Sequence, residues 1–183
     1  MEMLSKKFFE EDAAEVAQKL IGKRITYGGK SAVITETEAY GDDDPFCYGV
    51  RYEKTAKNSV SFMAGGYVFV YAGMLMITTG SKAGNPQNVL IRKASIPECN
   101  GPYNLRKYFE ITKDMNGKGT GIASGLIIED DASVKVEKSK RGKFRKDKAA
   151  VDYAHRHGLP EKVAQGKVDY YADIKWRFTL KKN

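Results

Sequence analysis

The sequence contains few of the residues that build metal sites, disulfide scaffolds and histidine-based catalytic centres. It has two cysteines, Cys47 and Cys99, and two histidines, His155 and His157. Two cysteines do not make a disulfide scaffold, and without a CxxC pair they give no sign of a zinc site. Two histidines exclude a three-histidine metal site and disfavour a histidine-based triad. No glycine-rich segment fits a phosphate-binding loop, so we expect no metal and no cofactor.

Long apolar runs are also missing. No stretch approaches the roughly 20 apolar residues of a membrane span, and the N-terminal residues MEMLSKKFFEEDAAEV lack the apolar core of a secretion signal. We therefore expect no membrane association, and a location in the cytoplasm at the nucleoid or in the nucleus. With 42% hydrophobic residues, the chain has enough material for one globular domain over residues 1–183.

Positive charge is present in excess. The chain carries 31 Lys+Arg against 23 Asp+Glu, a net charge of +8, which favours a polyanionic partner such as nucleic acid. The most basic segment is 137–148, EKSKRGKFRKDK. This segment is either a solvated loop or a run of phosphate contacts, in which each neutralised phosphate adds affinity.

Residue periodicity and turn signals predict a mixture of helices and short strands. Helical spacing of apolar residues predicts a helix over 10–21, and Pro102 opens a second one. Segment 41–58 is predicted to be a long surface loop. Strands are predicted in a hairpin over 24–40, at 67–71, 74–79 and 89–95, as a pair at 125–130 and 134–138, and in the tail at 173–180.

The segment ITETEAY, residues 34–40, is the strongest candidate for chemistry. On a strand, alternate side chains share a face, so Glu36, Glu38 and Tyr40 point the same way. Glutamate is depleted in strands, and a buried carboxylate with a raised pKa is a general-base candidate. The alternative is an exposed edge face with two solvated glutamates.

An arginine follows three aliphatic residues in VLIRKA. Arg92 is therefore either an outward-pointing strand residue or the partner of a buried acid. If its strand meets the ETEAY strand, the guanidinium can hold a glutamate ionised and fix its orientation.

Aromatic residues alternate in YVFVY. Tyr67, Phe69 and Tyr71 share one face of this strand, with Tyr40 and Tyr48 upstream. Such residues pack in a core, or they form a stacking pocket for a planar base.

Together these segments resemble the alkyladenine (3-methyladenine) DNA glycosylases of the mammalian type, which also occur in bacteria. Order and spacing agree over nearly the whole chain. The matching motifs are FF (8–9), LIGK (20–23), ETEAY (36–40), DDP (43–45), YVFVYAGM (67–74), VLIRKA (89–94), NGPYNL (100–105) and KWRF (175–178).

The resemblance implies a compact single-domain mixed α/β (α+β) fold with a curved antiparallel sheet and flanking helices. It implies a monofunctional DNA-repair hydrolase that flips a damaged purine out of duplex DNA and cuts its N-glycosidic bond. Glu38 matches the general base that activates the attacking water, and Arg92 matches the arginine that orients the base and the water. Tyr40 matches the aromatic residue that stacks on the flipped base.

Three pocket positions depart from the family pattern. Tyr48 stands where the family has a histidine on the other side of the base, and a tyrosine can still stack. Phe69 replaces a tyrosine and lacks its hydroxyl. Thr79 aligns with an asparagine that helps to exclude normal guanine, so discrimination against guanine is in question.

The residue that the family inserts into the DNA also differs. Ala72 replaces the tyrosine that fills the gap left by the flipped nucleotide, and a methyl group is too small for that role. Met74 or Leu75 is the expected substitute, because apolar wedges act this way in other DNA-binding proteins.

The expected partner is double-stranded DNA with damaged purines, bound by a monomer. Two other functions remain open. One is a nucleic-acid-binding relative without efficient catalysis, and the other is a purine nucleosidase or RNA-directed enzyme. The candidate phosphate contacts are Arg51, Lys54, Lys57, Lys140, Arg141, Lys143 and Arg145.

Overall fold

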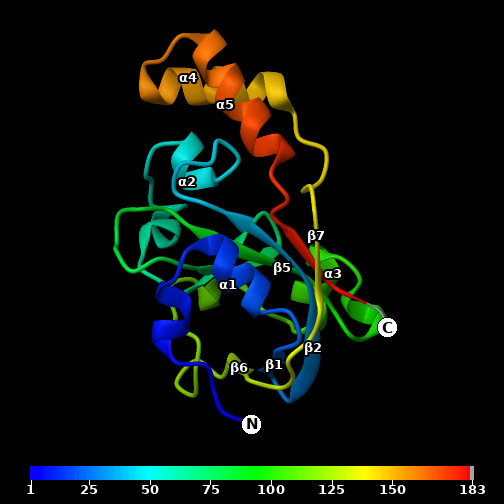
Figure 1. Ribbon diagram of the computed structural model, residues 1–183. Helices are drawn as coiled ribbons and strands as arrows, with labels where there is room; N and C mark the ends of the chain where they lie inside the picture. The colour runs from blue at the N-terminus through cyan, green and yellow to red at the C-terminus, as the bar shows by residue number, and fades with distance from the viewer. Residues whose placement is uncertain (182–183) are drawn as a thin grey trace.

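An eight-stranded antiparallel sheet forms the centre of the computed structural model, which describes residues 1–181 (Figure 1). Six strands follow the order β3-β4-β5-β2-β1-β6, while β8 pairs with β2 and β7. The expected α+β class is confirmed. The strands are β1 (Arg24–Tyr27), β2 (Lys30–Tyr40), β3 (Val68–Tyr71), β4 (Met74–Thr78), β5 (Asn88–Ala94), β6 (Ile127–Glu129), β7 (Val136–Ser139) and β8 (Arg177–Leu180).

The long strand β2 organises the sheet. Its first half pairs with β1, and its second half lies between β5 and β8. The β2–β5 ladder is irregular at Glu36, where the register shifts on both sides. Irregularities of this kind bend a strand and increase its twist, so β2 changes neighbours along its length.

The two faces of the sheet have different roles. One face packs under α1 (Ala13–Lys19) and α3 (Pro102–Tyr108). The Thr37 hydroxyl donates to the Ala17 carbonyl at 2.7 Å and so ties β2 to α1. This face contributes the main core, including Val68, Leu75, Ile77, Ala39, Val89, Ile91 and Phe178. The opposite face is not covered by α1 or α3, and it carries the polar side chains described below.

Two helices near the C-terminus form a hairpin at one end of the molecule. In Figure 1, α4 (Lys146–His157) and α5 (Glu161–Asp173) lie beyond α2 (Tyr48–Arg51), away from α1. Gly158 ends α4 in the left-handed conformation, with a φ of 63°. A second apolar cluster, in which alanine is the commonest residue, packs the hairpin against α2. Its members are Cys47, Val50, Ala149, Ala150, Tyr153, Ala154, Ala164 and Val168.

Two sequence-based expectations about the fold are wrong. Segments 125–130 and 134–138 do not pair with each other, because β6 pairs with β1 and β7 pairs with β8. Segment 41–58 is only partly a surface loop, since it contains α2 and buries Asp44 completely. Within residues 1–181, none of the helices has the length and apolar character needed to cross a membrane.

Candidate active site

A cluster of two carboxylates and two guanidiniums lies on the open face of the sheet. Glu38 is opposite Leu90 on β5 and Arg177 on β8, and residues directly opposite each other share a face. Glu38 Oε1 accepts hydrogen bonds from Nε and Nη2 of Arg177, at 2.9 and 2.7 Å. Arg92 Nη1 lies 3.4 Å from Glu38 Oε2, and Arg92 Nε donates to Glu36 Oε1 at 2.8 Å.

The irregular ladder explains how Glu36 is held. Glu36 lies opposite Lys93 and Thr37 lies opposite Ile91, which leaves Arg92 as the extra residue on β5. Regular alternation sends adjacent residues to opposite faces. Here Arg92 and Lys93 both bind Glu36, with Lys93 Nζ 3.0 Å from Oε2.

Both carboxylates are buried, at 6% exposure for Glu36 and 2% for Glu38. This decides against an exposed edge face. Burial alone raises the pKa of Glu36, but hydrogen bonds from Arg92 and Lys93 outweigh it and lower that pKa. Burial likewise lowers the pKa of Arg92, while Glu38 and Glu36 raise it above the usual value. Glu36 and Arg92 are therefore both charged at neutral pH.

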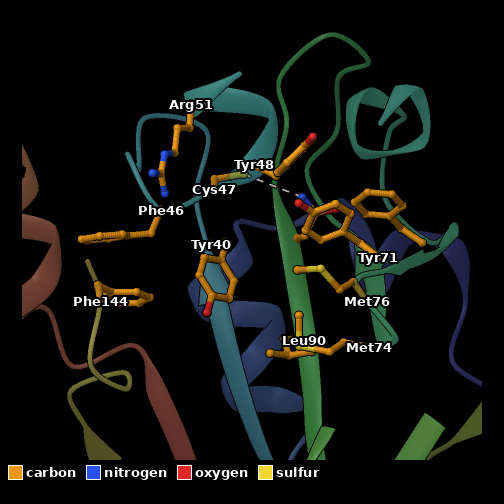
Figure 2. Close-up of a pocket in the computed structure, with 12 residues that line it drawn as sticks. Tyr40, Phe46, Cys47, Tyr48, Arg51, Tyr71, Met74, Met76, Leu90 and Phe144 are labelled. Carbon is orange, nitrogen blue, oxygen red and sulfur yellow. Dashed lines mark hydrogen bonds between the residues drawn. The ribbon is translucent and has the colours of Figure 1, made fainter. Parts of the chain in front are cut away.

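An apolar pocket of about 150 Å³ opens beside this cluster (Figure 2). Its connection to the cluster is Tyr40, whose hydroxyl donates to Glu38 Oε2 at 2.8 Å. Burial first, and then the Glu38 charge, raise the Tyr40 pKa well above its usual value, so the hydroxyl keeps its proton. The lining residues are Tyr40, Phe46, Cys47, Tyr48, Arg51, Phe69, Tyr71, Met74, Met76, Asn88, Leu90 and Phe144.

The aromatic residues of the pocket form two groups. Phe46 and Phe144 stack with ring centroids 3.8 Å apart. Tyr48 packs against Tyr71 at 4.3 Å and against Tyr52 at 4.8 Å. In Figure 2, Tyr48 lies on the Tyr71 side of the pocket and points away from Tyr40. The geometry thus provides a buried acid, fixed cations and a ring-lined cavity in contact with one another.

Comparison with known proteins shows the family to which this chain is related. A family model described as methylpurine-DNA glycosylase matches residues 7–98. The chain belongs to this family. Proteins named "putative 3-methyladenine DNA glycosylase" are similar to it. The one from Ehrlichia chaffeensis is 38% identical over 127 residues, which cover 62% of this chain and 69% of that protein. The one from Sodalis glossinidius is 38% identical over 125 residues, covering 62% and 72%.

Membership in the methylpurine-DNA glycosylase family identifies a DNA-repair hydrolase of the DNA glycosylase class, with alkylated bases as its substrates and DNA as its partner. The matched region contains Glu38 and Arg92. It ends before Arg177 and before the α4–α5 hairpin.

The structure places some predicted pocket and wedge residues elsewhere. Phe69 lines the pocket as expected, but Thr79 is fully buried outside the lining. Thr79 follows β4, and its backbone N–H donates to the Gln87 carbonyl at 3.0 Å. Leu75 is wrong as a wedge, because it is fully buried in the main core. Ala72 is exposed at the tip of the β3–β4 hairpin with a φ of 47°.

Arg141 is the main error among the predicted phosphate contacts. Its side chain is fully buried and donates to Asp44 Oδ2 at 2.5 Å and to the carbonyls of Ala39 and Tyr171 at 2.9 Å. Its guanidinium also lies 4.7 Å from the centre of the Tyr40 ring. Arg141 therefore has a structural role in joining the C-terminal segment to the end of β2.

The other predicted phosphate contacts differ in how exposed they are and in whether a carboxylate already pairs with them. Arg51 is half-buried and is paired with Asp152 at 2.5 Å. Lys140 is exposed but is paired with Asp173 at 2.6 Å. The remaining four are exposed: Lys54, Lys57, Lys143 and Arg145. Lys143 and Arg145 are the sequence neighbours of Phe144, which lines the pocket.

Several site residues escaped the sequence analysis, among them Arg177, Asn88 and Phe144. Arg177 belongs to the KWRF motif, and its alternation with Phe178 was the available signal. Asn88 is a polar residue at the start of a buried strand, a position where asparagine is depleted. Phe144 lies within a basic run, and nothing in the sequence links it to Phe46.

Proposed function

We propose that this chain is a single-domain, monomeric and monofunctional DNA glycosylase that hydrolyses the N-glycosidic bond of alkylated purines flipped out of duplex DNA. The observation that carries the proposal is the hydrogen bond from the Tyr40 hydroxyl to Glu38 Oε2. A base that stacks on the Tyr40 ring brings its sugar to the buried carboxylate. Stacking on aromatic and apolar side chains is how flipped bases are held.

In this proposal Glu38 is the general base. Its four contacts are two from Arg177, one from Tyr40 and the longest one, 3.4 Å, from Arg92. We place the attacking water beside Glu38 Oε2 and within reach of Arg92, because the Arg92 contact with that oxygen is the weakest of the four.

The reaction then proceeds by hydrolysis. The water gives one proton to Glu38, and its oxygen bonds to the sugar C1′ carbon while the bond from C1′ to the base nitrogen breaks. The bonding electrons go to the base. Alkylated purines such as 3-methyladenine are cationic and leave as neutral molecules, so no general acid is needed. The Glu38 carboxylate also stabilises positive charge that develops on the sugar.

The pocket mouth supplies the proposed DNA contacts. Met74 lines the pocket and follows the exposed turn at Ala72, so we propose Met74 as the wedge. The exposed Lys54, Lys57, Lys143 and Arg145 are the proposed phosphate contacts.

Release of free base tests the proposal. Wild-type protein and the Glu38→Gln variant are incubated with methylated duplex DNA, methylated RNA and free 7-methylguanosine, and released bases are chromatographed. We expect release from DNA by the wild type only, with DNA binding retained by the variant. Glu161→Gln, an exposed change on α5, is the matched control.

Other outcomes separate the alternatives. Salt-sensitive DNA binding without release, even at high protein concentration, identifies a non-catalytic binding protein. Release from RNA or from the nucleoside alone identifies an RNA-directed enzyme or a nucleosidase. For Arg92→Ala we expect a rate loss of about two decades, and a loss of only a few-fold would make Arg92 structural.

A further inference from the structure

Asn88 is a buried amide in the pocket with an unmet hydrogen bond. It is 1% exposed and lies between Tyr40 on β2 and Thr78 on β4. Its carbonyl oxygen Oδ1 is shielded from water and accepts no hydrogen bond from residues 1–181. Buried polar side-chain atoms nearly always have a partner, so this atom calls for an explanation.

The contacts of Cys47 fix which end of the amide lacks a partner. The Cys47 thiol donates to the Pro86 carbonyl at 3.3 Å. Burial raises the pKa of Cys47 to about 12, so the thiol keeps its one proton. The sulfur can then only accept, and it does so from Asn88 Nδ2 at 3.8 Å, the dashed line in Figure 2. The amide nitrogen therefore faces Cys47, and Oδ1 is directed elsewhere.

The pocket walls around Asn88 are apolar. Leu90 and Met76 follow on the same face, and Phe69 lies opposite Met76. These side chains can stack on a base or pack against it, but they cannot accept a strong hydrogen bond. Asn88 therefore places an amide hydrogen-bond acceptor in a wall whose neighbouring side chains are hydrophobic.

We propose that Asn88 Oδ1 selects purines that present an N–H donor at the edge of the base, such as the 6-amino group of 3-methyladenine. This inference rests on the proposed function, since it assigns the substrate class of the same pocket. Ethenoadenine has lost that amino group to its extra ring, so it leaves Oδ1 without a partner. A site built around a hydrogen bond rejects ligands that lack the matching group.

Two measurements test the inference. The first is equilibrium binding of free 3-methyladenine and free ethenoadenine. The second is single-turnover release of each base from duplex oligonucleotides. We expect the wild type to prefer 3-methyladenine, and Asn88→Leu to lower that preference about tenfold in binding and in release. Asn88→Ala is the second variant if Asn88→Leu fails to fold. Glu161→Gln, the exposed change on α5, should leave the ratio unchanged.

The results separate this inference from the proposed function. If both Asn88 variants keep the wild-type ratio, the inference is wrong even when methylated bases are released. If the wild type releases no base but its binding preference depends on Asn88, the proposed reaction fails and the assignment of Asn88 stands. If neither base binds and neither is released, both are overturned.

Discussion

Arg177 donates two hydrogen bonds to the same oxygen of Glu38, across a separation of 139 residues in the chain. The two residues are directly opposite each other on β8 and β2. A guanidinium that uses two donors fixes the position of a carboxylate more firmly than an ammonium does. The C-terminal strand therefore determines where the proposed base lies, although none of its residues lines the pocket.

We predict that Arg177→Ala slows base release about a hundredfold and Arg177→Lys about tenfold, because misplacing a catalytic group is costly. DNA affinity should change little, since Arg177 acts on Glu38. Single-turnover release and equilibrium DNA binding measure the two effects. Lys162→Ala, an exposed change on α5, is the control. A loss of DNA affinity with an unchanged rate would assign Arg177 to docking instead.

We predict that Arg141→Ala destabilises the protein by about 3–5 kcal/mol, because it leaves the Asp44 carboxylate buried without its partner. The nearby exposed change Lys143→Ala should shift the free energy of unfolding by less than about 0.5 kcal/mol. Urea denaturation of both variants checks this prediction. Equal stabilities would show that the pair contributes nothing to folding.

The lowered pKa of Glu36 gives a pH dependence of stability. A carboxylate with a depressed pKa in the folded state stabilises the fold above its unfolded pKa, and this contribution disappears as pH falls through the folded value. We predict that wild type exceeds Glu36→Gln in stability by a constant amount at neutral pH, and that the difference shrinks below about pH 4.5. Denaturation at several pH values measures it. A difference that grows on acidification contradicts the assignment.

The exposed basic residues beside Phe144 give a prediction for DNA binding. Replacing Lys143 or Arg145 by alanine should reduce the slope of log K against log salt by about one, because one phosphate contact is lost. Fluorescence anisotropy at several salt concentrations measures the slope. Lys113→Ala, an exposed change outside segment 137–148, should leave it unchanged. Equal slopes in all variants would place the DNA elsewhere.

Strand alternation made much of the site predictable. The period of two put Glu36, Glu38 and Tyr40 on one face, and the structure has all three in one network with Arg92. The same rule separates Arg177 from Phe178, but only the pairing of β8 with β2 brings Arg177 to Glu38. That pairing depends on contacts between distant segments, which local periodicity does not encode.

Other features were hidden for physical reasons. Helices α4 and α5 bury mainly alanines, such as Ala149 and Ala164, so they lack the strong apolar stripe that marks an amphipathic helix. Arg141 lies in a run of basic residues. Composition gave no sign that its side chain is buried and paired with Asp44, almost 100 positions earlier in the chain.

The stacked rings of Phe46 and Phe144 come from different parts of the chain. Phe46 lies within the region shared with the methylpurine-DNA glycosylase family, and Phe144 lies beyond it. Part of the cavity wall is thus encoded outside the region that matches the family. Natural variation at position 144 can therefore reshape the cavity without changing the contacts of Glu38, whereas variation at position 177 removes two of those contacts.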